Sequence, residues 1–199
     1  RRRRVDSAVT MDPGTTPVAA PDSAPAELRD LVAREWLAST LRTYPAQAQE
    51  ALAGTGSPFR NPVGSVLRDA LVGLTGELFG GFDRPRVRAL VDRVVRLRAV
   101  QDFTPSEVTG FVSFARGAVT RVAATARPPV PPDTLERVRA RIEALAPIAD
   151  DCASRCRDDL RAIAERAARR RVFLVDRMQA RVSRRPAAGP SAATRGQTS

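Results

Sequence analysis

The chain has 199 residues, 43% of them hydrophobic, which is enough for one globular domain with a core. Its formal net charge is +11, and all 33 basic residues are Arg, with no Lys and no His. The absence of His excludes Ser-His-Asp and Cys-His catalysis within this chain and removes the commonest metal ligand. A charge of this size favours an acidic protein, an anionic lipid surface or nucleic acid as a partner, without choosing among them.

No apolar run approaches the roughly 20 residues that a membrane-spanning helix needs. Arg1–Arg4 also lack the apolar stretch that follows the basic residues of a signal peptide. A cytoplasmic location is the simplest interpretation, and peripheral membrane contact stays open. Residue 1 is Arg, so one interpretation takes Met11 as the true start of the chain.

Residues 1–24 are rich in Pro, Ala, Ser and Thr and show no periodicity, which predicts a disordered segment. Pro25 opens a first helix that ends near Tyr44-Pro45, and a short helix over 45–53 follows, stopped by Gly54. The Gly- and Pro-rich stretch 54–60 predicts a loop. The expected inward face of the first helix consists of Leu28, Leu31, Val32, Trp36, Leu37 and Leu41.

Asn61 and Pro62 suit the N-cap and first turn of the next helix, which Gly80-Gly81 ends. Gly73 and Gly76 weaken its helix propensity and allow another helix to approach closely. Its inward residues fall at spacings of three and four: Val63, Val66, Leu67, Ala70, Leu71, Leu74 and Leu78.

Asp83 is predicted to cap a helix that runs to about Gln101, with Val87, Leu90, Val91, Val94 and Val95 at helical spacing. Thr104 and Glu107 form a capping box at the start of the following helix, with Pro105 at its first position. The stretch 96–107 therefore predicts a corner between two helices. Expected inward residues of the second helix are Val108, Phe111, Val112, Ala115, Val119 and Val122.

Residues 127–132 are a Pro-rich break, after which Asp133 and Glu136 predict a second capping box. A heptad-like apolar stripe then runs from Leu135 to Cys156 and slips in phase toward Leu174, and Pro147 is expected to kink or divide this helix. Residues 183–199 are predicted to be disordered. With no strand alternation and no internal repeat, we expect an all-α, single-domain helical bundle over 25–182. It should hold about five to seven helices and a long C-terminal one, with a globin-like arrangement as one option.

Several sequence motifs occur together in a distinctive order. They are Trp36, Thr43-Tyr-Pro45, Pro58-Phe59-Arg-Asn61-Pro-Val-Gly64, Leu67-Arg68, Arg96-Leu-Arg-Ala-Val-Gln-Asp-Phe-Thr-Pro-Ser106 and Cys156-Arg157. Over about residues 27–180 the chain resembles the N-terminal domain of the RsbT co-antagonist protein RsbRD. The resemblance implies a helical, non-enzymatic sensor or regulatory module. It assigns no activity, cofactor or ligand to any residue.

In stressosome proteins such a domain precedes a STAS domain, which binds partner-switch kinases. No STAS domain follows residue 182 here, so the resemblance implies a standalone version without the phosphorylated Thr sites. Standalone versions occur in sulfur-metabolising bacteria beside genes for membrane electron-transfer complexes. The expected partner is therefore a regulatory or redox protein complex, or a second copy bound through the long helix.

Four polar residues cluster at the end of the fourth expected helix: Arg96, Arg98, Gln101 and Asp102. One interpretation is a pocket for a small anion or a partner carboxylate, because Arg forks suit planar anions. The other is a structural network at the corner, in which an Arg satisfies the last carbonyls of the helix. Asn61 has the same two interpretations, as an N-cap or as part of an anion site.

A second candidate is the basic end of the last helix, with Arg166, Arg169, Arg170, Arg171 and Arg177. It suits docking to an acidic partner, a membrane surface or phosphates, or is simply a solvated helix end. Cys152 and Cys156 could be core residues, a redox pair or two shared metal ligands. We expect core packing, no metal and no cofactor, because no other Cys and no His could complete a site.

Two alternative functions stay open beside regulation. The first is a basic nucleic-acid-binding protein, which we do not favour because aromatic content is only 5% and no helix-turn-helix motif is present. The second is a ligand-binding globin relative, in which haem could be held only by Cys or Tyr since His is absent.

Overall fold

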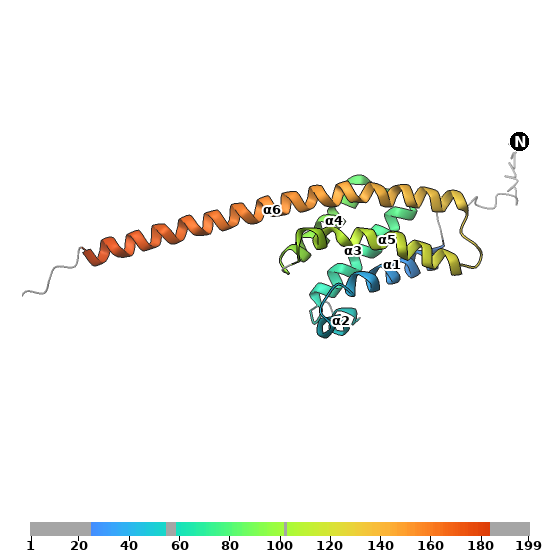
Figure 1. Ribbon diagram of the computed structural model, residues 1–199, viewed down its shortest axis with the longest axis horizontal. Coiled ribbons are helices and arrows are strands. Elements are labelled where there is room, and N and C mark those ends of the chain that lie inside the picture. Colours follow the sequence, from blue (N-terminus) through green and yellow to red (C-terminus); the bar gives the residue numbers. More distant parts are fainter. Residues whose placement is uncertain (1–24, 55–58, 102, 184–199) are drawn as a thin grey trace, which may run out of the picture. The chain divides into compact units, whose positions relative to one another are not determined.

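The computed structural model describes residues 25–54, 59–101 and 103–183. These residues form α1 (Ala26–Leu41), α2 (Ala46–Ala53), α3 (Pro62–Phe79), α4 (Arg84–Ala99), α5 (Pro105–Thr125) and α6 (Pro132–Ser183), and none of them lies in a strand (Figure 1). The all-α prediction is confirmed. The predicted disordered segments 1–24 and 183–199 lie outside the described residues, apart from Ser183, which ends α6.

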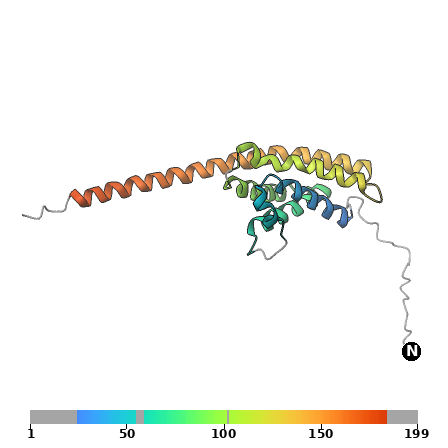
Figure 2. The same cartoon turned by 60° about the horizontal axis from the view of Figure 1, so that its bottom comes forward.

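The chain divides into two compact units, Arg1–Ser154 and Arg155–Ser199. The first contains α1–α5 and the amino-terminal part of α6, and the second contains the rest of α6. Within the first unit α1 packs against α3 and α5, and α3 packs against α4. Figures 1 and 2 both show α5 running beside the first part of α6.

A buried tryptophan joins α1 to α5. Trp36 is fully buried, and its Nε1 donates to the backbone oxygen of Phe111 at 2.7 Å. The two rings stack with centroids 6.4 Å apart. Around this pair the core is aliphatic, as the sequence spacing predicts. Its fully buried members include Leu67, Leu71, Leu74 and Leu78 from α3, Val87, Val91 and Val94 from α4, and Leu145 from α6.

The carboxyl end of α3 is fixed by groups from later in the chain. Arg141 of α6 donates from Nη1 to the Leu78 oxygen at 2.8 Å, which satisfies one of the carbonyls that a helix end leaves without an intrahelical partner. Glu77, only 9% exposed, accepts from the Asp83 amide at 2.9 Å and pairs with Arg86 at 3.2 Å. The α3–α4 turn is therefore held by charged hydrogen bonds as well as by apolar packing.

Three predicted local features differ, in whole or in part, from the structure. Asp83 stands at the N-cap of α4, but its side chain makes no capping hydrogen bond; its amide instead donates to Glu77. Asp133 is not an N-cap, because α6 begins one residue earlier, at Pro132, and Asp133 lies in its first turn. Of the two effects expected of Pro147, division of the helix is excluded, because α6 is continuous from Pro132 to Ser183; a kink stays a prediction.

Exposure corrects one further prediction and confirms another. Leu31, predicted to face inward from α1, is 49% exposed, whereas Leu28 and Val32 beside it are buried. In α6 the apolar stripe is buried through Cys152 and Cys156, which are 1% and 2% exposed and form no disulfide within the described part of the chain. The expected core packing of both thiols is confirmed. Beyond Cys156 no side chain that the structure describes is buried.

Candidate functional site around Arg98

The predicted corner between α4 and α5 is built by its local sequence. Thr104 is the N-cap of α5, and its Oγ1 accepts from the Glu107 amide at 3.4 Å. The Thr104 amide in turn donates to Glu107 Oε2 at 2.8 Å, which completes the capping box. Pro105 occupies the first turn, where its missing N–H leaves no acceptor unsatisfied. The predicted capping box is confirmed.

Arg98 is the centre of this corner. It is 1% exposed, and its Nε and Nη2 donate to the Glu107 oxygen at 3.2 and 3.1 Å. Nη2 also donates to Thr43 Oγ1 at 3.1 Å. One guanidinium therefore links α4, the start of α5 and the turn after α1.

Two aromatic rings enclose the same guanidinium. Its Cζ lies 3.9 Å from the ring centroid of Phe103 and 5.3 Å from that of Tyr44, within cation–π range. The rings meet edge to face, with centroids 4.9 Å apart. The Tyr44 hydroxyl donates to Gln101 Oε1 at 3.0 Å. Aromatic faces and backbone oxygen thus replace the water that the charge has lost.

Burial controls the electrostatics of the corner. It lowers the pKa of Arg98, against the opposing influence of Tyr44 and Glu107, and it raises the pKa of Tyr44, against the influence of Arg98. Hydrogen bonds from Thr104 lower the pKa of Glu107. An Arg guanidinium does not lose its proton in proteins. The corner therefore holds a buried cation, and within the described residues its Nη1 has no hydrogen-bond partner.

The structure brings together only part of the predicted polar cluster. Arg98 and Gln101 share contacts with Tyr44. Arg96 forms an ion pair with Asp92 at 2.7 Å on the half-exposed side of α4. Asp102 lies outside the described residues. The described contacts of Arg98 are those of a structural network; whether the cluster also binds an anion stays a prediction.

Asn61 lies apart, at the junction of α2 and α3. Its Oδ1 accepts from the Gly64 amide at 2.8 Å, as predicted for an N-cap, and its Nδ2 donates to the oxygens of Leu52 and Gly54 at 2.9 and 3.0 Å. A Cβ on Gly64 would collide with the Leu52 oxygen, so only glycine fits there. These contacts give the Asn-Pro-Val-Gly motif a structural explanation.

The basic residues predicted on the last helix are all exposed on α6, in the second unit: Arg166, Arg169, Arg170, Arg171 and Arg177. Arg169 contacts Glu165 at 3.4 Å, a helical pair four residues apart that stabilises little in water. The arrangement leaves a strongly positive helix available for contact.

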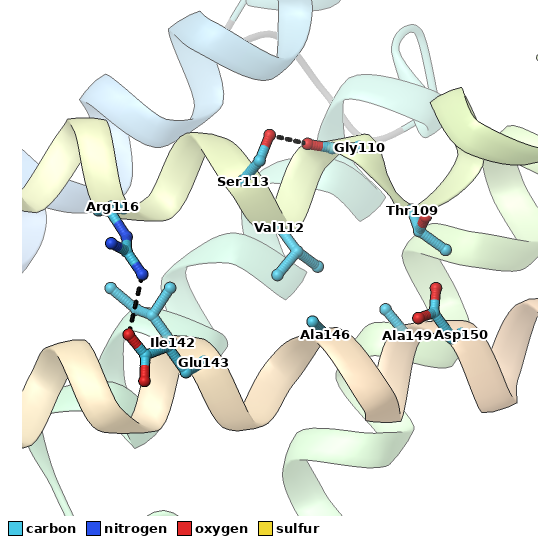
Figure 3. Close-up of a pocket in the computed structure, with 10 residues that line it drawn as sticks. All are labelled: Thr109, Gly110, Val112, Ser113, Arg116, Ile142, Glu143, Ala146, Ala149 and Asp150. Carbon is cyan, nitrogen blue, oxygen red and sulfur yellow. Dashed lines mark hydrogen bonds and ion pairs between the residues drawn. The ribbon is translucent and has the colours of Figure 1, made fainter.

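Two hollows lie where the sequence analysis predicted no site. A groove of about 570 Å³ between α5 and the first part of α6 has a mostly small, apolar lining that includes Gly110, Val112, Ala146 and Ala149. One of its edges carries the Arg116–Glu143 ion pair at 2.9 Å (Figure 3). A second hollow, of about 280 Å³, lies between α1 and α5. Helix packing alone creates both, so periodicity could not have indicated them.

The described residues lack both a cluster of metal-ligating side chains and a membrane-spanning helix. They contain no group of three or more Cys, Asp and Glu side chains placed to hold a metal ion. Among the helices that they form, none combines the length and the apolar character needed to cross a membrane.

The described residues thus form an all-α bundle domain. At its centre the buried Arg98 connects α4 to the start of α5 and to the turn after α1. The family model of the RsbT co-antagonist protein RsbRD N-terminal domain matches residues 30–172. The chain belongs to this family, as its motifs predicted, and the family points to a stressosome-related regulatory role. No curated protein and no solved structure matches the chain.

Proposed function

We propose that this protein is a non-enzymatic regulatory domain that acts through protein–protein contacts, made by α6 from residue 155 onward. Membership of the RsbRD N-terminal domain family supports the regulatory role. We place the contact surface on this segment because several of its apolar side chains are exposed to solvent. Ile163 is 58% exposed, Phe173 64% and Met178 68%.

Part of this apolar surface is ordered into one helix face. Leu160 and Ile163 are three residues apart, and Met178 follows Leu160 by five full turns at about 3.6 residues per turn. The helix that carries this face is rich in charge: over 155–183 nine Arg accompany four acidic residues. An apolar stripe bordered by charge is the pattern of a helix that packs on another helix. We take the first partner to test to be a second copy of this chain.

Size-exclusion chromatography with light scattering tests the proposal on the full chain. Self-association predicts a mass of twice 21.5 kDa that falls on dilution. Ile163→Glu should shift the equilibrium toward the monomer, since it places a charge on the apolar face. Ala168→Glu, an equally charged change at an exposed position off that face, should not. A monomer at all concentrations, together with no protein captured from native lysate, would contradict the proposal.

The basic helix also supports a second candidate function, binding to nucleic acid. Phosphate contacts by Arg predict an affinity that falls steeply with salt. Titration of labelled duplex DNA and of single-stranded RNA at about 50 mM salt separates the two functions. Tight binding with a steep salt slope would favour nucleic acid, and no binding would leave protein contact as the function.

A further inference from the structure

The smaller hollow has the chemistry of an anion site. It lies between the end of α1 and the middle of α5 and measures about 280 Å³. Its lining consists of Ser39, Arg42, Thr43, Ser113, Phe114, Gly117 and Arg121. The residues around this space thus carry two guanidiniums, three hydroxyls and one aromatic ring.

The two guanidiniums converge on one hydroxyl. Arg42 Nη2 donates to Ser39 Oγ at 2.8 Å, and Arg121 Nη2 donates to the same oxygen at 3.1 Å. Arg121 is balanced by Glu35, at 2.8 Å. No carboxylate in the described part of the chain pairs with Arg42, whose one side-chain hydrogen bond there is to Ser39. The hollow therefore has an uncompensated positive charge.

A third cation, the guanidinium of Arg98, lies behind the Thr43 side of the hollow. Thr43 Oγ1 accepts from the buried Arg98 at 3.1 Å and donates to the Thr40 oxygen at 2.7 Å. The Thr43 hydroxyl is fixed in this way, and the Arg98 charge stands directly behind it, with one nitrogen, Nη1, for which the described residues supply no hydrogen-bond partner. A partly enclosed space lined by one sign of charge concentrates counter-ions of the other sign.

Glycine sets the shape of the hollow on the α5 side. A Cβ at Gly117 would lie 3.1 Å from Arg121 Nη1, so the absence of a side chain lets this guanidinium lie against the helix. Phe114 adds an apolar wall. The volume exceeds that of a phosphate ion and leaves space for a small organic group beside it.

We propose that this hollow binds a small phosphate-class oxyanion, held by the forked N–H groups of Arg42 and Arg121 and by the Ser39 hydroxyl. Arg forks match the spacing of phosphate oxygens and make charge-assisted hydrogen bonds. The inference does not depend on the proposed protein contact, because the hollow lies wholly in the first unit and α6 from residue 155 onward lies in the second.

Isothermal titration of the full chain with inorganic phosphate, at ionic strength held constant with NaCl, tests this site. We expect one site per chain. Arg42→Gln should weaken binding about tenfold or more, since a hydrogen bond to a charged group is lost. Arg93→Gln removes the same charge from an exposed position on α4 and serves as the matched control. Its affinity should equal that of the unmodified chain.

A second variant keeps the test independent of Arg42. Gly117→Ala retains every charge but displaces the Arg121 guanidinium, so it should also weaken phosphate binding while circular dichroism stays unchanged. Two results would overturn the proposal. One is no binding heat up to about 10 mM phosphate. The other is equal weakening by Arg42→Gln and Arg93→Gln, which would reveal attraction to net charge alone.

Discussion

Replacing Arg98 with Ala tests whether the corner depends on a buried cation. The change removes hydrogen bonds to the Glu107 oxygen and to Thr43, and it uncovers the ring of Phe103. Hydrogen bonds to a charged group contribute about 1.5–3 kcal/mol each, and an enclosed cation–π contact about 1–2 kcal/mol. Relief of the desolvation penalty offsets part of this loss. The expected net destabilisation is about 3 kcal/mol, close to that of a large core truncation.

A second substitution separates charge from packing. Arg98→Met keeps an unbranched stem over Phe103 and removes the buried charge, so we expect a loss of only about 1 kcal/mol. Urea unfolding followed by circular dichroism measures both variants, with Arg93→Ala as an exposed control expected within about 0.5 kcal/mol of the unmodified chain. If Arg98→Ala unfolded at the same urea concentration as Arg93→Ala, the structural role assigned to Arg98 would be refuted.

Four further substitutions test local features. Glu107→Gln should make the free energy of unfolding depend less on pH at acid pH. The pKa of Glu107 is lowered in the folded state from its ordinary 4.5. The stability that the Glu107 carboxylate gives the fold is therefore complete above pH 4.5 and is lost as the pH falls through the lowered pKa. Urea unfolding at a series of pH values from neutral to acid measures this loss. Gly76→Ala should stabilise α3 by about 1 kcal/mol, as helix propensity predicts. Gly73→Ala should gain less, because its Cβ would lie 2.9 Å from Leu90 Cδ1, and equal urea midpoints for the two would contradict this packing. Asn61→Ala should cost about 1–2 kcal/mol in the same assay through loss of the cap, and a change below about 0.3 kcal/mol would show that the cap is dispensable.

Features that depend on residues close together in the sequence could be predicted from it. The Thr104–Glu107 capping box and the Asn61 cap each depend on groups three residues apart, and both are present. The caps at Asp83 and Asp133 were predicted by the same rule, but Asp83 occupies its N-cap without a capping hydrogen bond, and Asp133 is not an N-cap. In the first case Glu77 takes the amide hydrogen bond, and in the second the helix starts one residue earlier.

Features that need tertiary packing could not be predicted. The sequence placed Arg98 in a polar cluster at a helix end, but nothing local indicates that Arg98 is buried or that Tyr44 supplies one of the rings beside it. Likewise Arg42 and Arg121 are distant in the sequence, and only the packing of α1 on α5 brings both to Ser39. An aliphatic stripe indicates which side of a helix is buried, but not which polar groups meet at its edge.

The hydrogen bond between Arg141 and the Leu78 backbone oxygen affects how the chain folds during its synthesis. The ribosome releases α3 long before α6, so the emerging chain carries an uncapped helix end and an incomplete core. Val138, Ile142 and Leu145 of α6 are needed to bury that core, and all three are synthesised after the first five helices. We therefore expect the bundle to complete its folding only after α6 has left the ribosome at least as far as Leu145, and the nascent first five helices to expose apolar surface until then.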